Sequence, residues 1–356
     1  MTRKRVVRLP KNELGNDPHD FRHYPEFVRD APVESLLDGM SAWILTEEEE
    51  MRAKEGYWLY ENVIWHNHAC VLAGEANSGK TRIAMHMCCA IAQKGMDVRY
   101  INMDVNPADA VALGRTAREA GVKLMCPDLK GITSSEVLEN LRDLARSSED
   151  MSDLLIVIDN LKQIVDVINK KQLKEVMQLL CRTLTRNGAT VLLLTHTNKY
   201  KDKDGNPIFE GTNDLRDLTT ELFYLIVDKR EDYQTVQLIC NKDRIPGKVE
   251  PVSFEIDHQG NISKSETAID VRESIKQRKQ KAKDQEGIFH AIDRLKTEPL
   301  TETELAKHVA ECAAMGINAS RKLLKRYSGQ PNYWRCERGS NNSWIYRDWS
   351  APADKP

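Results

Sequence analysis

Short apolar runs rich in β-branched residues recur along the middle of the chain, and the first of them are separated by segments with apolar residues at helical spacing. The predicted strands are 70–73, 98–103, 154–158, 190–195, 222–227, 235–240 and 252–256. The predicted helices between the early strands are 80–93, 107–120, 136–146 and 172–186. This alternation predicts an α/β domain over residues 57–262, with a parallel sheet that the closely spaced late strands extend in antiparallel.

The two ends of the chain lack that alternation. Residues 1–56 mix charge, proline and short apolar pieces and predict an extended arm, with a short helix near 47–55 that begins at a capping box. Residues 263–284 contain the run KQRKQKAK and predict a basic linker or a charged helix. A winged-helix domain is predicted over 285–350, from helical patterns at 285–296, 302–313 and 319–327 and β-like pieces at 333–336 and 344–346.

The charge of the chain is unevenly distributed. Its 52 Lys and Arg and 54 Asp and Glu give a formal net charge of −2. Residues 1–271 nevertheless carry −8, whereas residues 272–350 hold 16 Lys and Arg against 10 Asp and Glu and carry +6. The near-zero average would argue against a nucleic-acid partner, but a basic tail on an acidic body is compatible with one.

Other features narrow the class of protein. No run approaches about 18 consecutive apolar residues, so we expect no membrane-spanning helix. The basic start of the chain lacks the apolar run of a secretory signal. The eight cysteines are scattered without a C-x-x-C pair, which argues against a zinc site or a redox dithiol. Together these observations predict a cytoplasmic protein.

The strongest chemical motif is GEANSGKT at residues 74–81, which matches the phosphate-binding pattern G-x-x-x-x-G-K-[ST] between a predicted strand and a predicted helix. Glycines let backbone N–H groups turn toward phosphate oxygens, and the helix N-terminus favours negative charge. Lys80 would supply charge at the β and γ phosphates, and Thr81 a hydroxyl ligand for Mg²⁺. The residues predicted to bind ATP with Mg²⁺ are Gly74, Asn77, Ser78, Gly79, Lys80 and Thr81.

Two acidic residues follow later strands. Asp159 ends the apolar run LLIVI, and because ligands bind at the carboxyl ends of parallel strands, we expect it to complete the Mg²⁺ site with Thr81. Asn160 comes next, so no second acid that could activate water stands beside Asp159. In one branch of P-loop ATPases that acid ends the strand after the P-loop helix, which makes Asp104 the candidate general base. Alternatively, Asp104 caps the following helix.

Taken in order, these motifs resemble those of a known family. The P-loop, Asp104, Asp159, the strand end LLLTHTNK with His196, and the segment GTNDLRD at 211–217 are similar to RecA-like ATPases of the RepA type. These are ring-forming replicative helicases of plasmids and phages, related to the DnaB group. The resemblance spans about residues 60–262 and implies a RecA-like core, a homohexameric ring, and a sensor role for His196 near the γ-phosphate. At position 104 the family usually has the longer Glu.

A second part of the resemblance concerns the segment NKDRIPG at 241–247. It looks like the K-x-R segment with which DnaB-like helicases reach the nucleotide of the neighbouring subunit, which implies that Lys242 and Arg244 act across an interface. An arginine supplied in trans would stabilise the charge of the transition state and couple hydrolysis to the arrangement of the subunits. Alternatively, the segment is a polar hairpin tip.

Two basic segments are candidates for contact with DNA. The polar stretch at 197–211 predicts a long loop whose Lys199, Lys201 and Lys203 bind backbone phosphates inside a ring, or else a solvated surface loop. The recognition helix and wing of the predicted winged helix carry Arg321, Lys322, Lys325, Arg326 and Arg338. A helix that enters the major groove needs such a basic face, although winged helices also bind proteins.

The sequence therefore predicts an ATP-driven, ring-forming DNA helicase or translocase of a plasmid, phage or mobile element. Its expected partners are further copies of the chain, single-stranded DNA, and double-stranded DNA at the winged helix. One alternative is an ATP-dependent DNA-binding regulator or initiator without processive unwinding. Another is a recombinase-like filament, for which long DNA loops and a polymerisation motif are not evident.

Overall fold

The computed structural model describes residues 40–41, 43–47, 56–201, 207–210, 213–245, 247–267, 269–339 and 343–350. The chain divides into two compact units, Met1–Glu55 and Gly56–Pro356. Most of the first unit lies outside the described residues, including most of the helix predicted near 47–55. The further division of the second unit at residues 262 and 284 stays a prediction.

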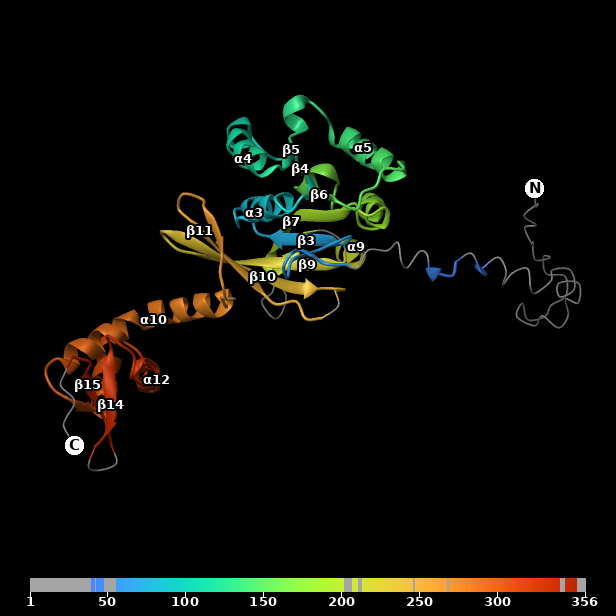
Figure 1. Cartoon of the computed structure of the whole chain (residues 1–356). Helices are drawn as coiled ribbons and strands as arrows, with labels where there is room; N and C mark the ends of the chain where they lie inside the picture. Colours follow the sequence, from blue (N-terminus) through green and yellow to red (C-terminus); the bar gives the residue numbers. More distant parts are fainter. Residues whose placement is uncertain are drawn as a thin grey trace, which may run out of the picture. The chain divides into compact units, whose positions relative to one another are not determined.

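A sheet of ten strands forms the centre of the second unit (Figure 1). Its order is β12-β11-β10-β9-β3-β7-β6-β4-β5, and β8 pairs with the end of β7. Strands β9, β3, β7, β6, β4 and β5 run parallel, and β10, β11 and β12 extend the sheet in antiparallel. The strands are β3 Ala69–Gly74, β4 Asp97–Asn102, β5 Lys123–Met125, β6 Leu154–Asp159, β7 Thr190–Lys201, β8 Pro207–Phe209, β9 Glu221–Lys229, β10 Tyr233–Lys242, β11 Val252–Asp257 and β12 Ile262–Lys264. The predicted parallel sheet with an antiparallel extension is confirmed.

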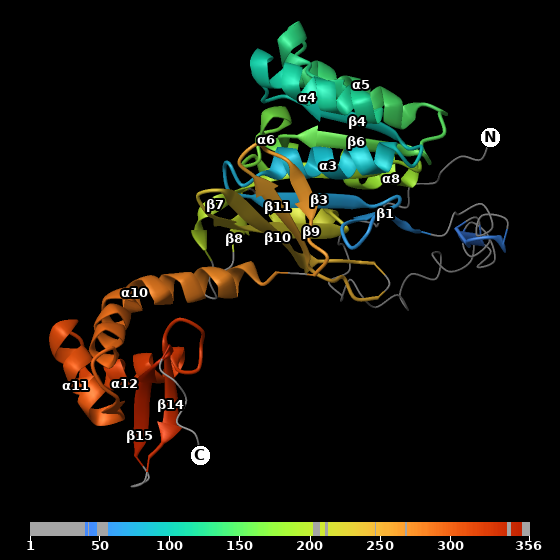
Figure 2. The ribbon, with the colours of Figure 1, turned by 60° about the vertical axis from the view of Figure 1, so that its left-hand side comes forward.

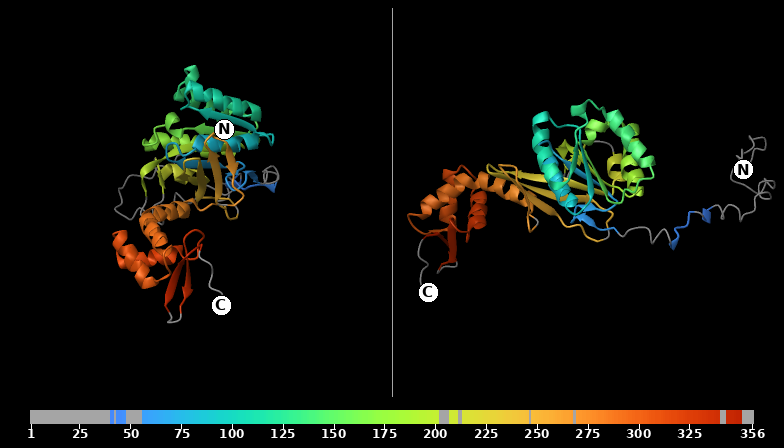
Figure 3. Two further views of the ribbon diagram at one scale, coloured as in Figure 1. Left: turned by 90° about the vertical axis from the view of Figure 1, so that its left-hand side faces the viewer. Right: turned by 45° about the horizontal axis from the view of Figure 1, so that its top comes forward.

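Both faces of the sheet are covered, which explains why its central strands are apolar along their whole length (Figure 3). Alternate residues of β3 enter opposite cores: Val71 packs in one and Leu72 in the other. One face is covered by α3 Lys80–Ala92, α4 Pro107–Ala120 and a small hairpin of β1 Trp58–Tyr60 and β2 Ile64–Trp65. The other is covered by α5 Ser134–Arg146, α6 Leu161–Ile164, α7 Lys170–Gln178, α8 Leu184–Arg186 and α9 Asn213–Leu218. Two further turns are the 3₁₀ segment Asp128–Lys130 and the π-helical segment Leu179–Thr183.

A smaller, separate core lies in the C-terminal part of the chain (Figure 2). Helices α10 Val271–Leu295, α11 Glu302–Cys312 and α12 Ile317–Tyr327 pack with a three-stranded antiparallel sheet of order β13-β15-β14. Its strands are β13 Leu300–Thr301, β14 Trp334–Arg338 and β15 Trp344–Asp348. The predicted capping box is present, since Thr301 and Glu304 exchange hydrogen bonds at the start of α11. Trp334 and Tyr346 are buried at the centre of this core.

The seven predicted strands are present, as are the predicted helices that fall on described residues, and the differences have simple causes. The missed strands β1, β2, β5, β8, β12 and β13 have three residues or fewer, which is too short for a visible alternation. The segment predicted as one helix at 172–186 contains a π-helical turn between two α-helices. The run KQRKQKAK lies inside the 25-residue helix α10, so the charged-helix alternative holds at this position. The predicted loop at 197–211 begins as strand, because β7 continues to Lys201 and pairs with β8.

Candidate functional site

The P-loop connects the buried strand β3 to helix α3. Asn77 and Gly79 adopt positive φ angles of 57° and 84°, which turn the backbone before the helix begins. A Cβ added at Gly79 would lie 2.8 Å from Cδ1 of Ile256, so both conformation and space require glycine there. Helix α3 starts at Lys80, and the first backbone amide that bonds back to the loop is that of Ile83, which donates to Gly79 at 2.9 Å. The earlier amides of the first turn are oriented as donors for an anion.

Lys80 is buried at the start of this helix, with 7% of its surface exposed. Its Nζ donates to the carbonyl oxygens of Gly74 and Glu75, both at 2.8 Å. Burial lowers the pKa of Lys80 to about 8, against the opposing attraction of Asp159 and Glu75. The ammonium is therefore held at the mouth of the loop, where an anionic ligand would restore its usual basicity.

Asp159 lies at the carboxyl end of β6 and is only 5% exposed. Its carboxylate accepts hydrogen bonds from the hydroxyl of Thr81 and from that of Tyr100, the latter at 2.8 Å, and Asn102 Nδ2 lies 3.4 Å away. Burial raises the pKa of Asp159, and these hydrogen bonds oppose the shift. The structure thus brings Thr81 and Asp159 together, as the motif predicts, and adds Tyr100 and Asn102 of the neighbouring strand as their support.

The candidate base Asp104 follows β4 and is exposed. Its Oδ1 lies 3.4 Å from Nε2 of Gln163, and its backbone N–H donates to Asn102 Oδ1 at 2.9 Å. The helix cap proposed as its alternative role belongs to Asn106, whose side chain accepts from the amide of Asp109 at 2.9 Å. Asp104 therefore remains available beside the cavity that Lys80 and Asp159 also line.

His196 lies directly beside the P-loop, since it pairs in register with Gly74 across β7 and β3. Its Nδ1 is 3.4 Å from Lys80 Nζ. Burial and the positive charge of Lys80 lower the pKa of His196, so the imidazole is neutral at pH 7. Glu210, which follows β8, donates its backbone N–H to the carbonyl of His196 at 2.8 Å and forms an ion pair with Lys162 at 2.7 Å. The sequence did not predict a role for Glu210 or Lys162.

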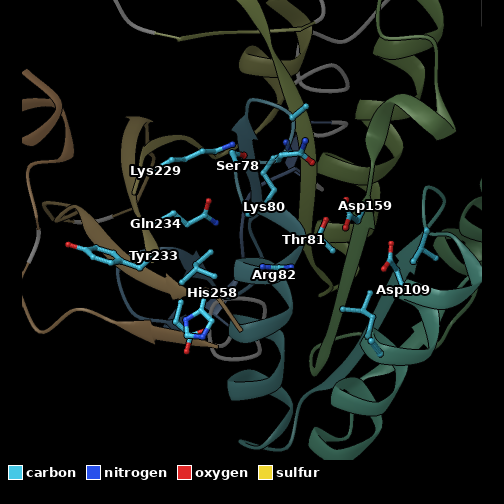
Figure 4. Close-up of a pocket in the computed structure, with 18 of the residues that line it drawn as sticks. Ser78, Lys80, Thr81, Arg82, Asp109, Asp159, Lys229, Tyr233, Gln234 and His258 are labelled. Atoms are coloured by element: carbon cyan, nitrogen blue, oxygen red, sulfur yellow. The ribbon is translucent and has the colours of Figure 1, made fainter. Parts of the chain in front are cut away.

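A cavity of about 960 Å³ opens over these groups (Figure 4). Thr81 and Asp159 lie on one side of it, and Lys229, Tyr233 and Gln234 come from the β9–β10 hairpin on the other side. Arg82 and His258 also line it. No sequence motif marks this second wall, because its residues come from a hairpin tip and a strand end without a fixed spacing to the P-loop.

Lys242 and Arg244 lie away from this cavity. Strand β10 runs antiparallel to β9, with Gln234 paired to Lys229 near the cavity and Lys242 paired to Leu222 at the other end. Seven residues of strand, or about 23 Å, separate those two positions on β9. Lys242 Nζ contacts the carbonyl oxygens of Arg216, of Asp217 at 3.2 Å and of Thr219 at 2.7 Å, at the end of α9. Arg244 donates one hydrogen bond of 3.4 Å to Asp217.

The residues predicted to contact DNA differ in their exposure and in their partners. Lys199 and Lys201 belong to β7, and Lys203 lies outside the described residues. On α12, Lys322 and Lys325 are exposed, while Arg321 and Lys325 lie 4.0 and 3.5 Å from Glu302. Arg326 instead pairs with the buried Asp284 of α10, which favours a packing role over the predicted DNA contact. Arg338 lies over the exposed ring of Trp344, 5.6 Å from its centroid.

The residues present fit a nucleotide with Mg²⁺. Ser78 Oγ is buried and has no hydrogen-bond partner within the described part of the chain, which suits a hydroxyl that faces a ligand. Thr81 and Asp159 offer the hydroxyl and carboxylate oxygens that Mg²⁺ prefers, and Lys80 offers a cation for phosphate. A bound Mg²⁺ would polarise and neutralise phosphate oxygens in this site.

A family model described as an AAA domain matches residues 42–202. No curated protein sequence matches the chain significantly. Among solved structures, one described as an ATPase domain is similar with a TM-score of 0.44 and 13% identity, over 67% of this chain and 100% of that chain. The flagellar accessory protein FlaH from Methanocaldococcus jannaschii has a TM-score of 0.40 and 11% identity, over 58% of this chain and 92% of that chain.

The AAA-domain match includes the P-loop, Asp159 and His196, and the parallel sheet places all three at one edge. The described core is therefore an α/β fold with a P-loop, in which residues 42–202 match an AAA domain. Within the part of the chain that the structure describes, no helix is both long enough and apolar enough to cross a membrane.

Proposed function

We propose that this protein is an ATP-driven, ring-forming DNA helicase or translocase that serves the replication of a plasmid, phage or mobile element. The observation that carries the proposal is the position of Arg244, at the opposite end of β10 from the cavity that holds Lys80. An arginine there does not reach the nucleotide of its own chain, but its side chain is exposed and could contact a second copy. Hydrolysis that needs a neighbour's arginine would favour a closed ring.

Within one chain, the residues that line the cavity would have separate roles in the binding and hydrolysis of ATP. Lys80 and the first amides of α3 bind the β and γ phosphates, and Thr81 and Asp159 hold Mg²⁺. Asp104 orients the attacking water from the end of β4. His196, neutral and 3.4 Å from Lys80, senses the γ-phosphate.

Strand β7 would connect hydrolysis to DNA. The same strand carries His196 beside the P-loop and, five residues or about 17 Å further on, Lys201 in the hairpin with β8. The Lys162–Glu210 ion pair and the Glu210 amide tie the base of that hairpin to His196. Movement of His196 on loss of the γ-phosphate would shift the hairpin, and Lys199, Lys201 and Lys203 would then contact single-stranded DNA in the channel.

The C-terminal domain would provide a separate contact with DNA. We infer a winged-helix arrangement, in which α12 presents Lys322 and Lys325 to the major groove and the β14–β15 hairpin presents Arg338 beside Trp344. Arg321 would join them once it is released from the weak pairing with Glu302 at 4.0 Å.

The test is to measure ATP hydrolysis by the full chain with and without single-stranded DNA, together with separation of a forked duplex. The proposal expects hydrolysis that DNA stimulates and strand separation that requires ATP. Lys80→Ala protein serves as the inactive control. Hydrolysis that no DNA changes, with no strand separation, would exclude the helicase.

The second candidate is a nucleotide-dependent DNA-binding switch. Asp104 favours it, because this carboxylate is exposed and its Oδ1 lies 3.4 Å from an amide rather than close to Lys80. Slow hydrolysis would then time assembly on DNA without processive movement. A sequence-specific footprint, combined with turnover too slow to separate strands, would favour this candidate over the first.

A further inference from the structure

The first half of helix α10 carries six basic residues and one acid, Glu273, between residues 272 and 283. The structure divides the six into two groups. Arg278 is fixed on the main sheet: it pairs with the buried Asp228 at 2.6 Å and donates to the carbonyl of Lys229 at 3.0 Å. Lys281 lies over the ring of Tyr333, 5.5 Å from its centroid. Arg278 thus attaches this part of the helix to the main sheet, and Lys281 contacts the C-terminal core.

The other four are Arg272, Lys276, Lys279 and Lys283. Their spacing of four, three and four residues places them on one face of the helix, separate from Arg278 and Lys281. All four are exposed, and the side chain of Lys276 remains 79% exposed although it lies 3.4 Å from Glu273. We call these four residues the α10 basic stripe.

We propose that the α10 basic stripe binds the phosphate backbone of duplex DNA. From Arg272 to Lys283 the helix rises by about 16 Å. Duplex DNA carries one negative charge per about 1.7 Å of its axis, so a stripe of this length faces about ten phosphate charges. Flexible lysines on a helix face suit backbone phosphates, which need charge rather than a fixed bidentate geometry.

The anchoring contacts explain why the stripe is a usable surface. Arg278 pairs with Asp228 and Lys281 lies over Tyr333, so these contacts position the helix without the stripe residues. Ser274 strengthens the attachment, since it donates to Asp228 and accepts from Arg230, both at 3.2 Å. The stripe is thereby presented on a fixed support, which lowers the conformational cost of binding.

This inference deepens the proposed contact with double-stranded DNA but does not require hydrolysis or a ring. The experiment therefore uses the full chain without nucleotide. Binding of a labelled duplex of about 30 base pairs, long enough for the roughly 16 Å stripe, and of the matching single strand is measured by fluorescence anisotropy over a range of salt concentrations. Because no nucleotide is present, a defect in ATP hydrolysis cannot be mistaken for a loss of DNA binding by the α10 basic stripe.

The test variant carries R272Q, K276Q, K279Q and K283Q, because glutamine keeps helix propensity close to that of lysine and arginine. If all four side chains contact phosphates, the slope of log K against log salt falls by about 3 to 4 for the duplex. Each single variant should reduce it by about 0.9, which covers the case in which the fourfold variant does not fold.

A matched control removes four exposed basic residues of the ATPase core with the variant R115Q, R118Q, K130Q and R142Q. The proposal expects the control to leave the slope unchanged. An unchanged slope in the stripe variant, or an equal decrease in stripe and control variants, would overturn it. A slope that decreases in the stripe variant for the single strand but not for the duplex would also overturn the proposal. The stripe would then bind single-stranded DNA.

Discussion

The nucleotide edge of the main sheet and the exposed basic surface of α10 and α12 use charge in opposite ways. At the edge, Lys80 and Asp159 are buried, and short hydrogen bonds and shifted pKa values follow from that burial. On the basic surface, Lys279, Lys283 and Lys322 are exposed. The activity of a buried site depends on each single group in it. The binding strength of an exposed surface depends instead on the number of its charges and on the salt concentration.

The difference predicts which substitutions have large effects. Loss of one group at the edge should remove most activity, because no other side chain can occupy its position. Loss of one lysine from the basic surface should weaken binding only slightly and in a salt-dependent way.

Arg244→Ala should reduce hydrolysis by about 10³-fold or more, because an arginine finger stabilises the charge of the transition state. Nucleotide binding should be retained, since Arg244 does not line the cavity. Steady-state hydrolysis and titration with a fluorescent nucleotide would measure the two effects. Lys242→Ala is the comparison: it should instead lower the stability of the fold, because Lys242 contacts three carbonyl oxygens at the end of α9.

Mixing Arg244→Ala chains with Lys80→Ala chains tests whether the arginine acts across an interface. Some interfaces in the mixture would combine an intact Arg244 with an intact Lys80, so part of the activity should return. If the mixture is no more active than its separate components, the proposed role of Arg244 across an interface is wrong.

Lys80→Ala should reduce hydrolysis by about 100-fold or more, because it removes the cation at the phosphate position. The fold should persist, since loss of a buried ammonium removes its desolvation cost. Lys94→Ala is a matched control beyond the far end of α3, where Lys94 donates to the carbonyl of Leu59. Equal turnover in the two variants would remove the P-loop assignment.

Nucleotide affinity should depend on pH in a specific direction. The pKa of Lys80 is lowered to about 8, so its ammonium is present below that pH and is lost as the pH rises through it. Affinity for ATP should therefore fall above about pH 8, by at most about tenfold per pH unit. Calorimetric titrations in buffers of different ionisation enthalpy would reveal the proton uptake. Lys80→Arg should bind without that dependence, because arginine stays charged.

The smallest effects concern the stability of the C-terminal core. Asp284 is buried and accepts from Arg326, from Tyr327 at 3.1 Å and from Gln280 at 3.1 Å. Asp284→Ala should lower the free energy of unfolding by about 2 kcal/mol. Glu302→Ala breaks only looser pairs of 3.5 and 4.0 Å with exposed or half-buried partners and should cost under about 1 kcal/mol. Denaturant unfolding of the full chain would rank the two, and an equal loss would contradict the role given to Asp284.

The main fold could be predicted from the sequence because its signals are local. The runs LLIVI and TVLLLT are buried on both faces, and a helix and a phosphate loop must follow β3 if GEANSGKT binds phosphate. The same logic placed Thr81 and Asp159 at one edge of the sheet, whereas the position of His196 there was implied only by the family resemblance.

What could not be predicted depends on contacts distant in the sequence. Tyr100 supports Asp159 from 59 positions away, and Tyr233 lines the cavity only because β10 folds back beside β9. On α10 and α12, the sequence could not separate arginines that pair with buried acids, such as Arg278 and Arg326, from lysines that remain exposed. A count of basic residues does not distinguish the paired arginines from the exposed lysines.

The central claim is that identical chains form a ring that hydrolyses ATP on DNA. The most direct test is the particle mass of the full chain with Mg²⁺, a slowly hydrolysed ATP analogue and single-stranded DNA, measured by native mass spectrometry or light scattering. The account predicts a particle of six 40.7 kDa chains that forms with these ligands. A single chain under every condition, with full ATPase activity, would contradict it.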